Sequence, residues 1–255
     1  MNTKMYNKVP AVTIFFWLIK IMATTVGETA ADFLNFNLHL GLTLTSYLMT
    51  GILVVALAMQ LRARKYVPSI YWFAVVLISI VGTLVTDNLV DNVGISLEAT
   101  TIGFSIALAT TFALWYASER TLSIHTIYTT KRELFYWLAI LFTFALGTAA
   151  GDLVAESFNI GYWPSALMFG SLIGVITLAY YRLKLNPVLA FWLAYILTRP
   201  FGASMGDFLS QPTRYGGLNL GTIDTSALFL VAIWGLVLYL GYQERRLAPA
   251  AEPLK

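Results

Sequence analysis

Apolar residues dominate eight stretches of the chain, and each is long enough to cross a lipid bilayer as a helix. A membrane-spanning helix needs about 20 mostly apolar residues. Charged and turn-forming residues are concentrated between the stretches, as at 62–65 and 211–217. The pattern predicts an all-α membrane protein with eight transmembrane helices, at residues 11–33, 42–61, 68–90, 99–117, 134–155, 164–181, 187–208 and 225–242.

Composition supports this fold class. Of the 255 residues, 58% are hydrophobic and only 11% are charged, whereas soluble domains average about 25% charged residues. Soluble globular, disordered and nucleic-acid-binding proteins are therefore excluded as classes. The absence of cysteine also excludes iron–sulfur clusters, thiolate zinc sites and cysteine nucleophiles, and no cofactor is expected.

The positions of the basic residues predict the orientation. Of the 16 Lys and Arg residues, 13 lie in the N-terminal segment, in the loops at 62–67, 118–133 and 182–186, or in the C-terminal tail. Because cytoplasmic loops carry an excess of Lys and Arg, both termini are expected in the cytoplasm of a bacterial inner membrane. Lys4 and Lys8 before the first apolar run would also fit a cleaved signal peptide.

The odd-numbered stretches share one repeated pattern: an aromatic residue, Trp, nine residues, Gly, four residues and Asp. Successive copies are 55, 65 and 55 residues apart, so the two halves, 1–120 and 121–255, superimpose at an offset of 120 residues without a gap. Each unit holds two spans, which predicts four parallel two-helix repeats within one membrane domain. Because the first copy matches the others, the first stretch belongs to the mature fold. The copies are Phe16-Trp17…Gly27…Asp32, Tyr71-Trp72…Gly82…Asp87, Tyr136-Trp137…Gly147…Asp152 and Phe191-Trp192…Gly202…Asp207.

This Trp–Gly–Asp pattern resembles a bacterial family of uncharacterised membrane-anchored proteins, which are made of tandem two-helix repeats with a recurrent tryptophan. The resemblance covers essentially the whole chain. It implies the repeat architecture and the membrane location, and it implies no particular activity.

The repeated Trp and Gly residues have structural interpretations. Trp17, Trp72, Trp137 and Trp192 are expected either to anchor at the membrane interface or to pack inside the bundle. Small residues let helices approach closely, so the glycines indicate tight packing. A local helix break that exposes backbone carbonyls to a substrate is the alternative. These glycines are Gly27, Gly82, Gly147 and Gly202.

The repeated aspartates are the candidate functional residues. Each lies about 20 residues into its span, near the outer end of the helix, where a negative charge opposes the helix dipole. Three copies hold a second carboxylate four residues away, and like charges at this spacing repel. Acidic residues inside spans commonly mark ion or proton paths, with structural pairing or capping as the alternative. The candidates are Asp32, Asp87, Asp152 and Asp207, with Glu28, Asp91 and Glu156.

Supporting residues are expected around these carboxylates. Lys20 and Arg199 are the basic residues inside spans, and either can reach an aspartate only across helices. An all-oxygen ligand set suits hard ions such as Mn²⁺, Ca²⁺ or Mg²⁺. His39 and His125 lie in loops and are expected to be solvent-exposed. The hydroxyl groups expected to support the site belong to Thr29, Thr83, Thr148 and Ser204.

Three functions from different classes follow. The leading hypothesis is a small secondary transporter or exporter of a hard cation or of a proton-coupled solute; its partners are the bilayer and that cation or proton. The Gly-Asp dipeptides ending at Asp152 and Asp207 are loosely similar to the core of a manganese/calcium exchanger motif, without its glutamate and basic residue. The alternative is a non-transporting sensor, assembly factor or scaffold. An intramembrane aspartyl hydrolase is disfavoured because Ala149 and Ser204 replace the first Gly of its motif, so no enzymatic activity is expected. Convergence of the four aspartates on one axis would favour an ion site.

Overall fold

The predicted helical architecture is confirmed. The computed structural model describes residues 7–37 and 40–247, and these form eight α-helices and no β-strand. All eight are long and apolar enough to cross a membrane, and their spans match the predicted boundaries within four residues. Lys4 and His39 lie outside the described residues. The helices are α1 (Ile14–Asp32), α2 (Leu42–Arg62), α3 (Pro68–Asp87), α4 (Leu97–Glu119), α5 (Thr130–Asp152), α6 (Tyr162–Leu183), α7 (Pro187–Ser210) and α8 (Thr222–Leu247).

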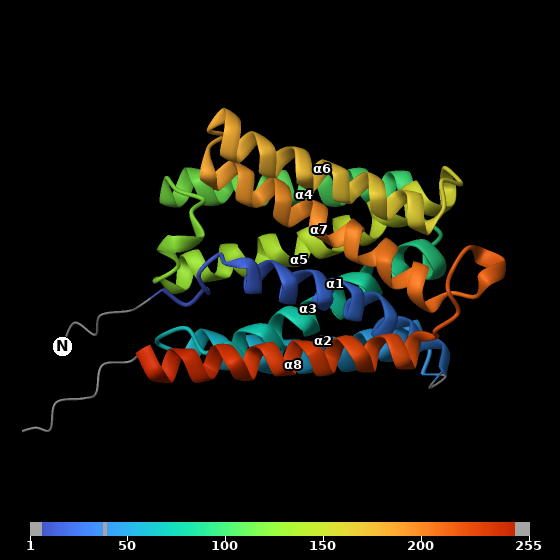
Figure 1. Cartoon of the computed structure of the whole chain (residues 1–255), viewed down its shortest axis with the longest axis horizontal. Coiled ribbons are helices and arrows are strands. Elements are labelled where there is room, and N and C mark those ends of the chain that lie inside the picture. The colour runs from blue at the N-terminus through green and yellow to red at the C-terminus, as the bar shows by residue number, and fades with distance from the viewer. Residues whose placement is uncertain (1–6, 38–39, 248–255) are drawn as a thin grey trace, which may run out of the picture.

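The odd-numbered helices form a ring of four. Helix α1 packs against α3, α3 against α5, α5 against α7, and α7 returns to α1. The even-numbered helices cover this ring from outside, and in Figure 1 they lie above and below the ring helices. Between 56% and 78% of each ring span is buried, compared with 11–22% of each covering span. The ring is therefore the core of the protein.

The second helix of each repeat packs against the ring helix of the next repeat. Helix α2 packs on α3, α4 on α5, α6 on α7, and α8 on α1. The arrangement has pseudo-fourfold symmetry, and it closes only when the last helix reaches the first.

The repeated glycines lie at the contacts between ring helices. A methyl group at any of them would overlap a side chain of the neighbouring ring helix, and that side chain always lies three residues before the glycine of its own helix. The α-helices continue through all four positions, so the glycines serve close packing rather than a local break. The pairs are Gly27 with Ser79, Gly82 with Phe144, Gly147 with Arg199, and Gly202 with Thr24.

The aromatic residues of the repeat form a second cyclic set of contacts. Each aromatic residue that precedes a Trp packs against the Trp of the next ring helix, with ring centroids 5.5–6.3 Å apart. Trp72, Trp137 and Trp192 are buried and Trp17 is half-buried, so packing inside the bundle accounts for them. We call these eight residues the aromatic layer. It consists of Phe16, Tyr71, Tyr136 and Phe191 with Trp17, Trp72, Trp137 and Trp192.

The two ends of the bundle differ in charge. The basic end contains both described termini and the loops at 63–67, 120–129 and 184–186. The acidic end contains the segments at 33–37, 40–41, 88–96, 153–161 and 211–221. At the acidic end, three ring helices turn into π-helix directly after the repeated aspartate, whereas α7 continues to Ser210. Three of the repeated aspartates are thus followed by one π-helical turn, and the fourth, Asp207, lies in the last turn of α7. The π-helical turns are η1 (Phe33–Asn37), η2 (Asn88–Asn92) and η4 (Leu153–Ser157); short 3-10 turns are η3 (Ile124–Thr126) and η5 (Thr213–Tyr215).

A buried ion pair fixes the N-terminal segment to the basic end. Lys8 Nζ lies 2.6 Å from Glu133 Oε2 of α5 and donates a hydrogen bond to the Leu61 carbonyl at 3.0 Å. Gln60 Nε2 donates to the other oxygen of Glu133 at 3.1 Å. Lys8, Gln60 and Glu133 are all buried, so this ion pair is shielded from water.

Candidate functional site: a carboxylate cavity on the ring axis

The structure brings the predicted carboxylates together at the acidic end of the ring. A cavity of about 220 Å³ opens there, and all four ring helices contribute to its wall. The four repeated aspartates converge on it, as an ion site would require. Its lining includes Glu28, Asp32, Asp87, Asp91, Asp152, Glu156 and Asp207.

Three of these carboxylates are close enough to share one cation. One oxygen each from Glu28 of α1, Asp152 of α5 and Asp207 of α7 lies within 4.8 Å of the other two. Glu28 and Asp207 are buried and Asp152 is half-buried. Negative charges at this separation repel strongly in a poorly solvated site. We call these three residues the carboxylate cluster; it requires positive charge from a side chain, a cation or protons.

Glu28 occupies a different layer from the repeated aspartates. Each aspartate lies five residues after the glycine of its repeat, whereas Glu28 follows Gly27 directly. The positions equivalent to Glu28 are occupied by Thr83, Thr148 and Ala203. The pair Glu28/Asp32 therefore extends inward along the axis. In contrast, Asp91 and Glu156 lie one turn outside their aspartates.

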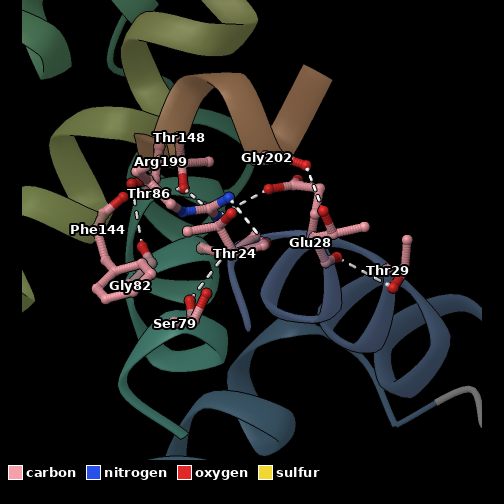
Figure 2. A network of polar contacts seen from close by, with 12 residues as sticks. Thr24, Glu28, Thr29, Ser79, Gly82, Thr86, Phe144, Thr148, Arg199 and Gly202 are labelled. Atoms are coloured by element: carbon pink, nitrogen blue, oxygen red, sulfur yellow. Dashed lines mark hydrogen bonds and ion pairs between the residues drawn. The ribbon is translucent and has the colours of Figure 1, made fainter. Parts of the chain in front are cut away.

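Arg199 lies beneath the carboxylate cluster and compensates part of its charge (Figure 2). Its Nη2, which has two N–H groups, lies within hydrogen-bond distance of three acceptors: Glu28 Oε2 at 2.8 Å, Thr148 Oγ1 at 2.7 Å and Thr83 Oγ1. Nη1 donates to the Thr24 carbonyl at 3.3 Å. Glu28, Thr83 and Thr148 hold the same position in the three other ring helices, so the guanidinium lies on the pseudo-fourfold axis.

Lys20 lies on the axis without a carboxylate partner. Its side chain is fully buried, and Nζ lies 4.2 Å from the ring centroids of both Phe144 and Tyr195. Phe144 belongs to α5, diagonally opposite α1 in the ring. Among the described residues Nζ has no hydrogen-bond partner. Cation–π contacts therefore replace the carboxylate pairing considered from the sequence.

The hydroxyl residues predicted to support the site divide into two groups. Thr83 and Thr148 contact Arg199, as described. Thr29 instead donates to the Thr25 carbonyl and contacts Ser226 of α8, so it faces a covering helix. Ser204 is buried, and its hydroxyl has no partner among the described residues. Neither Thr29 nor Ser204 lines the cavity.

The predicted candidates did not include three polar residues of the cavity, Asn35, Thr86 and Gln211. Asn35 lines it from the π-helical turn η1. Its equivalents in the other repeats are two apolar residues and a serine, namely Val90, Ala155 and Ser210. Position in the sequence therefore gave no signal. His125 is exposed at the basic end and takes no part in the site.

The four repeats coincide with a known family of repeats. The family described as Repeat of Unknown Function (DUF347) matches residues 15–66, 70–121, 135–186 and 190–246. The chain belongs to the DUF347 family. Each match starts one residue before the aromatic residue that opens the Trp–Gly–Asp pattern, so a DUF347 repeat comprises one ring helix and the covering helix that follows it. No curated protein and no solved structure matches the chain.

Proposed function

We propose that this DUF347 protein binds a hard cation in the cavity at the acidic end and transports it, in exchange with or together with protons, across the bacterial inner membrane. The carboxylate cluster carries the proposal, because three buried or half-buried carboxylates from three helices lie within 4.8 Å of one another. In this proposal both termini and the basic end face the cytoplasm, as the distribution of Lys and Arg predicts.

The chemistry of the cavity favours a hard divalent ion. The lining offers carboxylate oxygens, the Asn35 and Gln211 amides and the Thr86 hydroxyl, without sulfur or imidazole. Oxygen ligands suit Mn²⁺, Ca²⁺ and Mg²⁺. The cavity volume of about 220 Å³ exceeds that of one ion, since a water molecule occupies about 30 Å³ in the liquid. A cation that keeps part of its hydration shell fits this space.

Transport requires the ring to change conformation. Between the carboxylate cluster and the basic end, the axis is filled by Arg199, Lys20 and the aromatic layer. The residues that line the cavity all belong to the acidic end of the bundle. Because ring helices meet at glycines, small relative shifts of whole helices would open a route for the ion. Protons on unliganded carboxylates provide the coupling charge.

Cation binding and flux test the proposal directly. Purified protein is titrated with Mn²⁺ in detergent, and Mn²⁺, Ca²⁺ and Mg²⁺ uptake is measured in proteoliposomes. Asp207→Asn removes a member of the cluster and should weaken Mn²⁺ binding at least ten-fold. Asp87→Asn removes a cavity carboxylate outside the cluster and should weaken it less. Asp224→Asn is the matched control, since Asp224 is exposed at the start of α8 and should bind like the wild type.

The outcomes separate the two leading functions. Saturable binding with flux that Asp207→Asn abolishes supports transport. Saturable binding without flux of any tested ion would favour the scaffold alternative, with the cation as a structural element. Equal binding by wild type and Asp207→Asn would refute the cation site.

A further inference from the structure

We propose that Arg199 is a tethered cation that competes with the bound ion for Glu28, and that this competition sets the cation affinity of the cavity. The inference rests on the proposed function, because it concerns the same site. It assigns Arg199 a role in setting the cation affinity, in addition to that of a structural ion pair.

The first observation is that Glu28 is shared. On one side its Oε2 accepts a hydrogen bond from Arg199 Nη2 at 2.8 Å. On the other side Glu28 lines the cavity and belongs to the carboxylate cluster with Asp152 and Asp207. A cation in the cluster and the guanidinium would therefore bind the same carboxylate. Two positive charges so close together repel, which weakens the binding of each.

The second observation is that the guanidinium occupies the axial position itself. Arg199 comes from α7 and reaches Thr83 in α3, the diagonally opposite helix. It also contacts Thr148 in α5 and the backbone of Thr24 in α1. Any ion that moves from the cluster toward the basic end would have to displace this guanidinium. Figure 2 shows how its contacts converge from the surrounding helices.

The third observation is the broken symmetry of the two layers. At the position of Arg199 the other repeats carry Thr24, Ser79 and Phe144, and at the position of Glu28 they carry Thr83, Thr148 and Ala203. One positive and one negative residue thus replace uncharged ones in adjacent layers. Packing alone does not require this charge pair, since a buried ion pair contributes little net stability compared with apolar residues of similar size.

A substitution that removes the positive charge of Arg199 tests the competition. Arg199→Gln removes the tethered charge, and Mn²⁺ should then bind at least ten-fold more tightly than in the wild type, because Glu28 becomes fully available. Arg199→Lys keeps the charge and should stay within about three-fold of the wild type. Mn²⁺ should raise the melting temperature of Arg199→Gln by more than it raises that of Arg199→Lys. A purely structural Arg199 would give weaker or unchanged binding after its removal.

A second variant avoids the risk that Arg199→Gln fails to fold. Thr148→Val is nearly isosteric and removes one acceptor that holds the guanidinium, so Mn²⁺ should bind about three- to ten-fold more tightly while all charges stay in place. Thr143→Val is the matched control. Thr143 is buried on the same helix, and its hydroxyl bonds only to the Ala139 carbonyl among the described contacts.

The results distinguish failure of this inference from failure of the proposed function. If the wild type shows no saturable Mn²⁺ binding, the proposed function fails. If the wild type binds Mn²⁺ and neither Arg199→Gln nor Thr148→Val binds it more tightly than its own control, the inference is overturned and the cation site remains. Tighter binding in both variants with unchanged controls supports competition for Glu28.

Discussion

The buried ion pair at the basic end predicts a large and specific loss of stability when one partner is removed. Lys8 Nζ lies 2.6 Å from Glu133 Oε2, and the side chains are 0% and 1% exposed. Lys8→Met deletes the positive charge, and the buried Glu133 side chain then keeps the Gln60 amide as its partner among the described residues. Breaking a buried pair from one side costs about 3–5 kcal/mol, because the remaining charge is uncompensated.

The free energy of unfolding in mixed micelles measures this cost. For a chain of this length, 1 kcal/mol corresponds to about 2–4 °C in melting temperature, so Lys8→Met should lower it by roughly 6 °C or more. The double variant Lys8→Met/Glu133→Gln keeps an acceptor for Gln60 and removes both charges, and it should recover most of the loss. An equal loss in the single and double variants would refute the electrostatic reasoning.

An exposed ion pair provides the control. Lys131 Nζ lies 3.4 Å from Glu119 Oε1 at the same end, and its side chain is 62% exposed. Glu119 also keeps Arg132 as a partner at 2.8 Å. Because water screens such a pair, Lys131→Met should leave the melting temperature unchanged within error.

Two further predictions concern packing of the ring. Gly82→Ala should destabilise the protein by about 1–3 kcal/mol, because the added methyl group would overlap Phe144. Gly103→Ala, on the open face of α4, is the control and should be neutral or stabilising by up to about 1 kcal/mol. Thermal unfolding of the two variants side by side measures both effects, and equal effects would contradict the ring packing. Tyr71→Phe should lower the free energy of unfolding by about 1–3 kcal/mol, because it leaves the buried Tyr136 hydroxyl without its partner at 2.5 Å. Adding Tyr136→Phe should restore most of this stability, since the two other repeats carry phenylalanine at this position. A double variant less stable than the single one would count against this explanation.

Much of the fold was predictable because its signals are local. Span boundaries depend on the length of apolar runs, and those runs end in charged or turn-forming loops. The repeat was visible because Trp, Gly and Asp recur at fixed spacing. Glycine at a fixed position also indicated close helix approach, which the contacts of Gly27 and Gly82 confirm.

The layer in which each charge lies was harder to predict. An i,i+4 pair looks the same whether its second member extends inward, as Glu28 does from Asp32, or outward, as Asp91 does from Asp87. Only the distance from the repeated glycine separates the two cases. The π-helical turns after the aspartates have no sequence signature of this kind, and Asn35 enters the cavity through one of them.

Contacts between distant segments were not predictable from one sequence. Lys8 belongs to a basic segment, and its positive charge contributed to the expected orientation. Its burial against Glu133 depends on how residues 7–13 cross the basic end. Arg199 could only be predicted to pair across helices. Its axial position follows from the cyclic order of the ring, which spacing along the chain does not encode.

The packing of each second helix against the next repeat has a consequence for assembly. No repeat buries its own ring helix completely, because the covering helix on each ring helix comes from another repeat. Helix α1 is therefore covered only after α8, the last helix, has been synthesised. The helix contacts thus form a closed circle, and the chain ends lie at one point of it. Both described ends lie at the basic end, and the three junctions between successive repeats lie there too, so the chain ends can be moved to one of these junctions. A permutant that starts within 121–129, with the original ends joined, should keep the same neighbours for every helix.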